Sequence, residues 1–223
     1  MNVNISVLGK IDYAEALAIQ QKLHELRLQN QIEDTFLLLE HPPVLTLGTR
    51  GVYSNILLPE KELEAGGVKI YEVNRGGDVT YHGPGQIVGY PVMDLKEHGR
   101  DIKQFVWNLE EVFIRLLKEN FEISAYRDQN KYTGVWVDNN KITAIGIAVK
   151  RWVTMHGFAF NVNTNLEHFK WINPCGILDK GVTSLEKLTG SEHDISHMNE
   201  LLIKYFTEIF GLEYKLVDIK QLI

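Results

Sequence analysis

Two amphipathic helical segments lie far apart in the sequence, with short strand-like segments between them. The pattern over 102–120 places large apolar residues on one side of a helix: Phe105, Leu109, Val112, Phe113, Leu116 and Leu117. Such an apolar stripe faces the core of a globular protein. A second helix of this kind is predicted over 196–210. Because the strands between them do not alternate strictly with helices, the pattern favours an α+β fold with mixed sheets over a doubly wound parallel sheet.

The remaining elements follow from the same helix and strand periodicities. Residues 2–8 alternate as a strand does, and apolar residues spaced by about 3.6 positions predict a helix that opens at Asp12. The segment Asp138-Asn139-Asn140 predicts a tight hairpin turn, since Asn and Asp tolerate positive φ. Further strands are predicted over 35–39, 68–73, 86–95, 134–137, 141–149, 157–162 and 213–217.

The composition is that of an ordinary globular protein and excludes several other classes. With 223 residues, 44% of them apolar and 23% charged, the chain can bury one sizeable core. No linker or repeat divides it, so we predict a single domain over residues 1–223. A formal charge of −6 argues against nucleic-acid binding. We expect a cytoplasmic protein without membrane contact, because there is one cysteine, no signal peptide and no apolar stretch of about 20 residues.

The most unusual segment is the glycine-rich stretch from Arg75 to Gln86. It combines four glycines and one proline with arginine, aspartate, threonine, histidine and glutamine side chains. Glycine lets the backbone approach a ligand closely, while Arg75, Thr80 and His82 supply directed hydrogen-bond donors. A plain surface turn needs no ligand, but such turns rarely combine so many glycines with such varied side chains. We therefore predict a binding loop, although not the GxxxxGK[ST] loop that holds phosphates.

The single cysteine, Cys175, stands between a proline and a glycine. Lone cysteines are usually buried as small apolar side chains, but a Pro-Cys-Gly loop is an unusual place for one. A reactive thiol needs a nearby cation to lower its pKa from about 8.5. The candidate cations are His41, His82, Lys141 and His156, and their spacing does not choose among them. For His41 the two following prolines favour a structural role in a turn, and Lys141 also fits a solvated lysine at a strand edge.

Five segments together resemble the lipoyl(octanoyl) transferases, a family often called LipB. They are LLLEHPPVLTLGTRG (37–51), RGGDVTYHGPGQIVGYP (75–91), GVWVDNNKITAIG (134–146), HGFAFNVN (156–163) and INPCGILDKGVTSL (172–185). The resemblance covers the chain from about residue 35 to residue 187, and the segments occur in the order that the family has them.

This resemblance implies an α+β fold like the catalytic domain of biotin and lipoate ligases. It also implies that octanoyl passes from acyl carrier protein to one lysine of a lipoyl domain, through a cysteine thioester and without a cofactor or metal. The acceptors would be the lipoyl domains of 2-oxoacid dehydrogenase E2 subunits and the glycine cleavage H protein. The family's catalytic cysteine and lysine fall on Cys175 and Lys141. Its substrate-binding positions fall on Arg75, Gly76, Gly77, Asp78, Val79, Thr80, Tyr81, His82, Ala144, Ile145, Gly146, Gly157, Phe158 and Ala159.

Three other functions compete with this one. A lipoate–protein ligase would share the fold but use ATP, and such ligases resemble a loop of RR…GGG…HD…N type, which the segment from Arg75 to Gln86 does not match. An amidotransferase that passes octanoyl between lipoyl domains also uses a cysteine, but we do not expect it to carry the intact RGG…YHGPGQ block. A non-catalytic acyl-binding module would leave Cys175 and Lys141 without a role.

Overall fold

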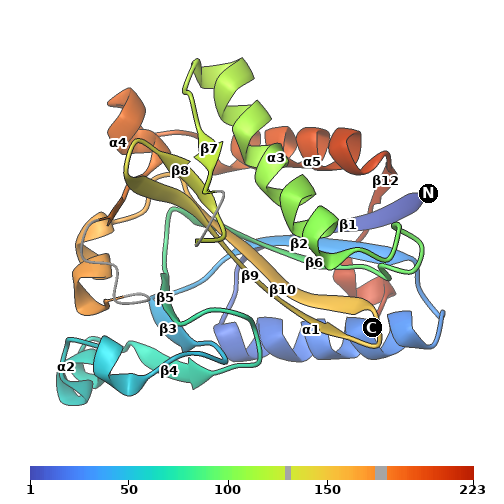
Figure 1. The fold of residues 1–223 in the computed structure, drawn as a ribbon. Coiled ribbons are helices and arrows are strands. Elements are labelled where there is room, and N and C mark those ends of the chain that lie inside the picture. The colour runs from blue at the N-terminus through green and yellow to red at the C-terminus, as the bar shows by residue number, and fades with distance from the viewer. Residues whose placement is uncertain (129–131, 174–179) are drawn as a thin grey trace.

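The computed structural model describes residues 1–128, 132–173 and 180–223. Within these residues the chain forms one large and one small β-sheet (Figure 1). The large sheet has the order β12 (Glu213–Leu216), β1 (Asn2–Lys10), β2 (Asp34–Glu40), β6 (Gln86–Val92), β10 (Val153–Asn161), β9 (Asn140–Lys150), β8 (Val135–Val137) and β7 (Tyr126–Arg127), and β11 (Gly181–Val182) also pairs with β9. The small sheet has the order β4 (Lys69–Glu72), β3 (Val44–Leu47) and β5 (Val79–His82).

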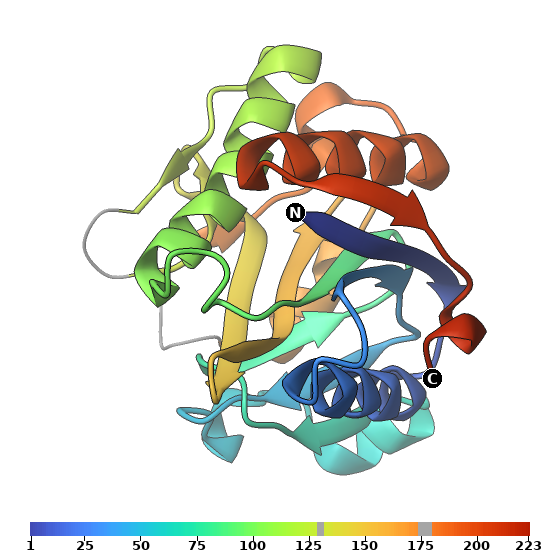
Figure 2. The ribbon, with the colours of Figure 1, turned by 90° about the vertical axis from the view of Figure 1, so that its right-hand side faces the viewer.

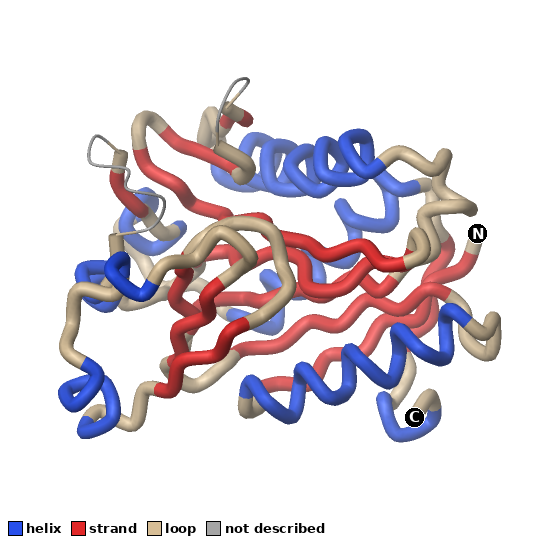
Figure 3. Tube along the Cα trace, turned by 60° about the horizontal axis from the view of Figure 1, so that its bottom comes forward, coloured by secondary structure: helices blue, strands red, loops and turns tan. Residues whose placement is uncertain are grey.

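Helices cover both faces of the large sheet (Figure 2). The main core lies under α3 (Ile102–Phe121) and α5 (Ile195–Phe210), where Phe36, Phe113 and Phe206 are fully buried. On the opposite face, α1 (Tyr13–Leu28) packs on a second core that includes Leu37 and Val88. The small sheet lies beside the start of α1, as Figure 3 shows, and forms a third core together with α2 (Glu60–Ala65). Parallel and antiparallel pairs occur in one sheet, so the predicted α+β class with mixed sheets is confirmed.

The predicted helices form where the sequence places their capping residues. Asp12 accepts a hydrogen bond from the Ala14 amide (2.8 Å) at the start of α1, and Asp101 and Asp194 cap α3 and α5 in the same way. The hairpin between β8 and β9 turns at Asp138, which has a φ of 50°. The strand predicted over 157–162 is longer, because β10 begins at Val153. The strand predicted over 86–95 is shorter, because β6 ends at Val92. The single domain over residues 1–223 stays a prediction.

The sequence analysis missed much of the small sheet. The segment from Arg75 to Gln86, which we interpreted as a loop, contains strand β5, whose partner β3 is only four residues long. Alternation along β5 buries Val79 and Tyr81 in the third core. Such a short strand depends on long-range pairing rather than on local pattern. Short elements also missed are α4 (Leu185–Thr189), β7, β11 and the 3₁₀ turns Tyr53–Asn55, Leu166–Trp171 and Ile219–Gln221.

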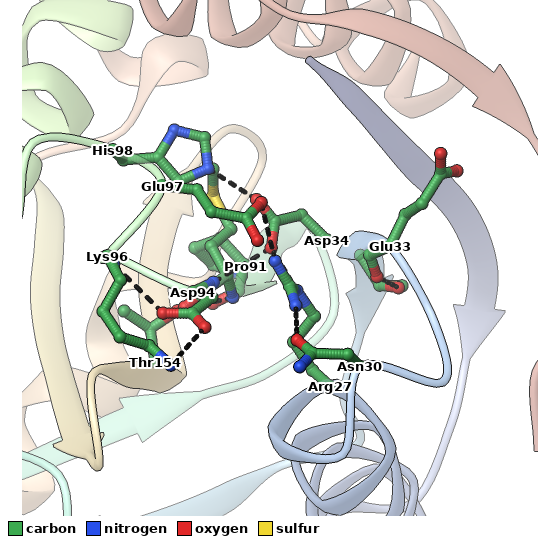
Figure 4. A network of polar contacts seen from close by, with 12 residues as sticks. Arg27, Asn30, Glu33, Asp34, Pro91, Asp94, Lys96, Glu97, His98 and Thr154 are labelled. Carbon is green, nitrogen blue, oxygen red and sulfur yellow. Dashed lines mark hydrogen bonds and ion pairs between the residues drawn. The ribbon is translucent and has the colours of Figure 1, made fainter.

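A buried ion-pair network ties α1 to β2 and to the loop after β6 (Figure 4). Arg27 lies 2.8 Å from Asp34 through Nε and 2.8 Å from Glu97 through Nη2. The second oxygen of Asp34 contacts His98 Nε2, and the Asp94 amide donates to the first oxygen at 2.9 Å. Burial alone raises the pKa of Asp34, but the hydrogen bonds from His98, Arg27 and Asp94 outweigh it and hold this pKa below its usual value.

Replacing Asp34 with asparagine should lower the free energy of unfolding by about 3 kcal/mol at neutral pH, because Arg27 loses a buried counter-charge. The folded-state pKa of Asp34 lies below the unfolded-state value. Its contribution is therefore complete above about pH 4 and is lost as the pH falls through the folded-state pKa. Urea unfolding at a series of pH values should show the two proteins converging in acid. The control Glu33→Gln, at the half-buried neighbouring carboxylate that pairs with the exposed Lys215, should change stability by less than about 1 kcal/mol, and an equal loss there would contradict the prediction.

Candidate active site

A cavity of about 580 Å³ lies between the large sheet and the small one. This volume is typical of small-molecule sites, which range from about 300 to 1,000 Å³. Its lining includes residues of β9 and β10 and the segment Arg75–Thr80, which leads into β5. Tyr13 from α1 and Tyr90 from β6 also line the cavity. Lys141 from the start of β9 lines it as well.

The structure brings the predicted site residues together, with two exceptions. Those that line the cavity are Lys141, Arg75, Gly76, Gly77, Asp78, Val79, Thr80, His82, Ala144, Ile145, Gly146, Gly157, Phe158 and Ala159. Tyr81 does not line it: its side chain packs in the third core, and its hydroxyl lies 2.6 Å from His168 Nδ1. Alternation along β5 turns Tyr81 to the face opposite that of Thr80 and His82. Cys175 lies outside the described residues.

The Arg75 side chain holds the glycine-rich segment from within. It is 8% exposed, and its Nη2 donates to the carbonyl oxygens of Thr46 (2.7 Å) and Asp78 (2.8 Å). Its Nη1 donates to the Gly76 carbonyl oxygen at 3.0 Å, and Thr46 Oγ1 accepts from Nε and Nη2. These contacts fix the backbone between β3 and β5, so Arg75 shapes the cavity wall as well as lining it.

Glycine is required where two backbones meet beside the cavity. A Cβ atom on Gly48 would lie 2.5 Å from the Gly77 carbonyl oxygen, and one on Gly146 would lie 2.8 Å from the Gly76 carbonyl oxygen. The Gly76 amide donates to the Ile147 carbonyl oxygen at 2.9 Å. The glycine-rich segment therefore lies directly against β9, which a side chain at Gly146 would prevent.

The side chain of Lys141 lies against an aromatic ring. Lys141 pairs with Trp136 of β8 in register, and its Nζ lies 4.7 Å from the centre of the Trp136 ring. Lys180 Nζ lies 4.4 Å from the same ring and forms an ion pair with Asp128 at 2.8 Å. On the other side of β9, the Thr183 amide donates to the Lys141 carbonyl oxygen at 3.0 Å. Strands on both sides thus fix the backbone from which Lys141 projects.

The three histidines considered as cations are buried and neutral at pH 7. Burial lowers the pKa of His82 to about 3, and the positive charge of Arg75 acts in the same direction. Burial also lowers the pKa of His41 and of His156 to about 4. The His41 ring nitrogens lie 2.8 Å from the Ile11 carbonyl oxygen and 2.8 Å from the Tyr90 hydroxyl, in agreement with the structural role expected for His41. None of these imidazoles can supply a permanent positive charge to a thiol.

A chain of hydrogen bonds links the glycine-rich segment to β11. His82 Nδ1 lies 2.8 Å from Gln86 Oε1, and Gln86 Nε2 donates to Asn161 Oδ1 at 2.9 Å. Asn161 Nδ2 then donates to the Thr183 carbonyl oxygen at 3.0 Å. Gln86 belongs to the predicted binding loop, whereas no role was predicted for Asn161, which lies inside a segment that carries the family resemblance. Tyr13 also lines the cavity, but nothing in the sequence around it indicates a role in binding.

In the part of the chain that the structure describes, no group of three or more His, Cys, Asp or Glu side chains is placed to hold a metal ion. Among the described helices, none is both long and apolar enough to cross a bilayer. The cytoplasmic location stays a prediction.

Comparison with known proteins first defines the class. Residues 12–207 match the family described as the lipoyl protein ligase A/B catalytic domain. A bi-partite lipoate protein ligase from Thermoplasma acidophilum has a similar structure, with a TM-score of 0.74 at 14% identity over 100% of this chain and 90% of that one. A biotin protein ligase from Aquifex aeolicus aligns with a TM-score of 0.54 at 15% identity over 95% of this chain and 69% of that one. The predicted likeness to the catalytic domain of lipoate and biotin ligases is confirmed.

Relatives with higher sequence identity define the family within this class. The octanoyltransferase of Caldicellulosiruptor saccharolyticus is 58% identical over 100% of this chain and 94% of its own length. The octanoyltransferase of Desulforamulus reducens is also 58% identical, over 100% of this chain and 97% of its own length. The chain belongs to the octanoyltransferase family and is therefore an enzyme, as the resemblance predicts.

Proposed function

We propose that the enzyme moves an octanoyl group from acyl carrier protein to one lysine of a lipoyl domain, through a thioester on Cys175. Membership of the octanoyltransferase family supports octanoyl as the group that is transferred. The observation that carries the rest is the cavity in which Lys141 lies with the glycine-rich segment and the small residues of β9 and β10. The three buried histidines are neutral, which favours Lys141 among the four candidate cations.

In the first step, the Cys175 thiolate attacks the thioester carbonyl of octanoyl-carrier protein. The bond to the pantetheine sulfur breaks, and the leaving thiolate takes a proton from the Lys141 ammonium, which becomes a free amine. One thioester replaces another, so the exchange is nearly isoenergetic and needs no ATP. The ammonium of Lys141 lowers the pKa of the thiol. A positive charge at about 4 Å contributes roughly 4 kcal/mol at an effective dielectric of about 20, which is enough for this shift.

In the second step, the acceptor lysine attacks the acyl-enzyme as a neutral amine. An amide bond forms, the bond to the Cys175 sulfur breaks, and Lys141 as the free amine takes the proton that the attacking nitrogen loses. Amide formation from a thioester is downhill and drives the transfer. The oxyanion needs backbone donors. The Gly76 amide is already bonded to the Ile147 carbonyl oxygen, so it is not one of them.

The acyl chain would lie along the small residues of β9 and β10. Ala144 and Ala159 line the cavity, and each CH₂ buried there contributes about 0.8 kcal/mol. Gly157 has a different role, because a Cβ atom on it would lie 2.1 Å from the Gly89 carbonyl oxygen of β6. Gly157 is therefore required for the packing of β10 against β6 rather than for the width of the cavity.

Intact mass spectrometry after incubation with octanoyl-carrier protein, without ATP, tests this proposal. We expect one octanoyl adduct, on the peptide that contains Cys175, and its transfer to apo lipoyl domains of E2 subunits or to the apo glycine cleavage H protein. Absence of the adduct would overturn the thioester mechanism. Modification of the acceptor only when ATP and free octanoate are supplied would instead identify a ligase.

A further inference from the structure

Glu110 of α3 is a buried carboxylate that the proposed mechanism does not use. Its side chain is among the buried charged groups, with the residue 7% exposed. Oε1 accepts a hydrogen bond from the Gly134 amide at 3.0 Å, in a fully buried contact. Oε2 lies 3.4 Å from Arg127 Nε. The neighbouring Glu111 also pairs with Arg127 but takes part in a second ion pair with Arg115 on the outer side of α3.

Gly134 joins this carboxylate to Lys141. Its φ is 126°, and a Cβ atom on it would lie 2.5 Å from the Thr143 carbonyl oxygen, so only glycine fits there. The same position lies 3.4 Å from Cε and 3.5 Å from Cδ of Lys141. The end of the Lys141 side chain therefore lies beside Gly134, whose amide donates to Glu110.

We propose that Glu110 is a positioning residue for Lys141. Its carboxylate fixes Gly134 against the lysine side chain and supplies the negative charge that keeps the Lys141 amine protonated while the thiol is activated. The inference rests on the proposed function, since it assigns Lys141 a charge that the first step needs.

Among the described residues, the other charged side chains around Lys141 either oppose its protonation or take part in ion pairs. Lys180, the residue before β11, lies near the same Trp136 ring as Lys141, but Lys180 forms an ion pair with Asp128. Arg127 of β7 lies beside Glu110 and Glu111. Burial raises the pKa of Glu110, while the Gly134 amide, Arg127 and Lys141 act to lower it. Without Glu110, Lys141 would face cations from β7 and from the residue before β11 with less negative charge to balance them.

The direct test is a pH titration of Lys141 in the whole chain, with NMR of ¹³C-labelled lysine as the readout. The Lys141 signal is identified as the one that is missing from Lys141→Arg. Glu110→Gln keeps an oxygen acceptor for the Gly134 amide and removes only the charge. The midpoint of the Lys141 titration should fall by about one pH unit. The matched control Glu111→Gln removes the adjacent carboxylate, which shares Arg127, and should leave the midpoint unchanged. Equal midpoints in the native protein and in Glu110→Gln would overturn the proposal.

A charge-retaining variant separates electrostatics from packing. Glu110→Asp should keep the midpoint close to the native value, and a fall as large as that in Glu110→Gln would contradict the electrostatic role. If Glu110→Gln does not fold, the Lys141 midpoint in Glu110→Asp still tests the electrostatic role of Glu110. The titration does not depend on transfer activity. A native enzyme that forms no octanoyl adduct disproves the proposed function alone, whereas an active native enzyme with an unshifted Glu110→Gln midpoint disproves this inference alone.

Discussion

Cys175→Ala is expected to lower the rate of octanoyl transfer by at least about 10³-fold, because the variant has no nucleophile to form the acyl-enzyme. Lys141→Ala should lower the rate by about 10² to 10⁴-fold, the usual contribution of a positioned acid or base. The measurement is the initial rate of lipoyl-domain octanoylation with octanoyl-carrier protein. Thermal unfolding of each variant shows that the chain is folded.

A lysine on the same strand provides the control. Lys150 lies at the opposite end of β9, is exposed and does not line the main cavity. Lys150→Ala should transfer octanoyl at the native rate. The rate of alkylation of the single cysteine against pH adds a second measurement, in which Lys141→Ala should move the midpoint upward. An unchanged midpoint would remove Lys141 from its proposed role, and a native transfer rate in Cys175→Ala would remove the covalent step.

Arg75→Ala is expected to lower the free energy of unfolding by about 3–5 kcal/mol. The guanidinium group donates to the buried carbonyl oxygens of Thr46 and Asp78, and each loses a charged donor when the side chain is removed. Octanoyl transfer should fall as well, since these contacts fix one wall of the cavity. Urea unfolding measures the first effect and the transfer assay the second.

Two comparisons separate the hydrogen-bonding geometry of Arg75 from its charge. Arg75→Lys keeps the positive charge but not the planar set of donors, so it should recover only part of the stability. Arg50 also lines the cavity but is exposed, and Arg50→Ala should change stability by less than about 1 kcal/mol. If Arg75→Ala were as stable as Arg50→Ala, the structural role of Arg75 would be wrong.

The sequence predicted the long elements well because their signals are local. The apolar stripe of α3 lies within one continuous segment of the chain, and Asp12 acts in the first turn of the helix that it caps. Apart from β4, which falls within the strand predicted over 68–73, the small sheet has no such signal. Its strand β3 is four residues long and exists only because β4 and β5 pair with it from positions farther along the chain.

The candidate site was predictable to the extent that its residues are contiguous. The segment from Arg75 to His82 and the residues of β9 and β10 line one cavity, apart from Tyr81, whose direction depends on β5 being a strand. Tyr13 lines the cavity from α1, and Glu110 of α3 contacts it only indirectly, through Gly134. No local sequence pattern distinguishes either residue from its neighbours on the helix. Whether Cys175 joins them is a prediction that the transfer and labelling experiments test.

The pairing of β1 affects how the chain folds during its synthesis. β1 pairs with β2 on one side and with β12 on the other, so the large sheet joins the first and last strands of the chain (Figure 2). On the ribosome, β2 is available soon after β1, but Glu213–Leu216 emerge only after the other described strands. Until then the outer edge of β1 has unpaired N–H and C=O groups, which readily pair with other chains. The nascent chain is thus exposed to aggregation at this edge until β12 has been synthesised, and docking of β12 ends that period.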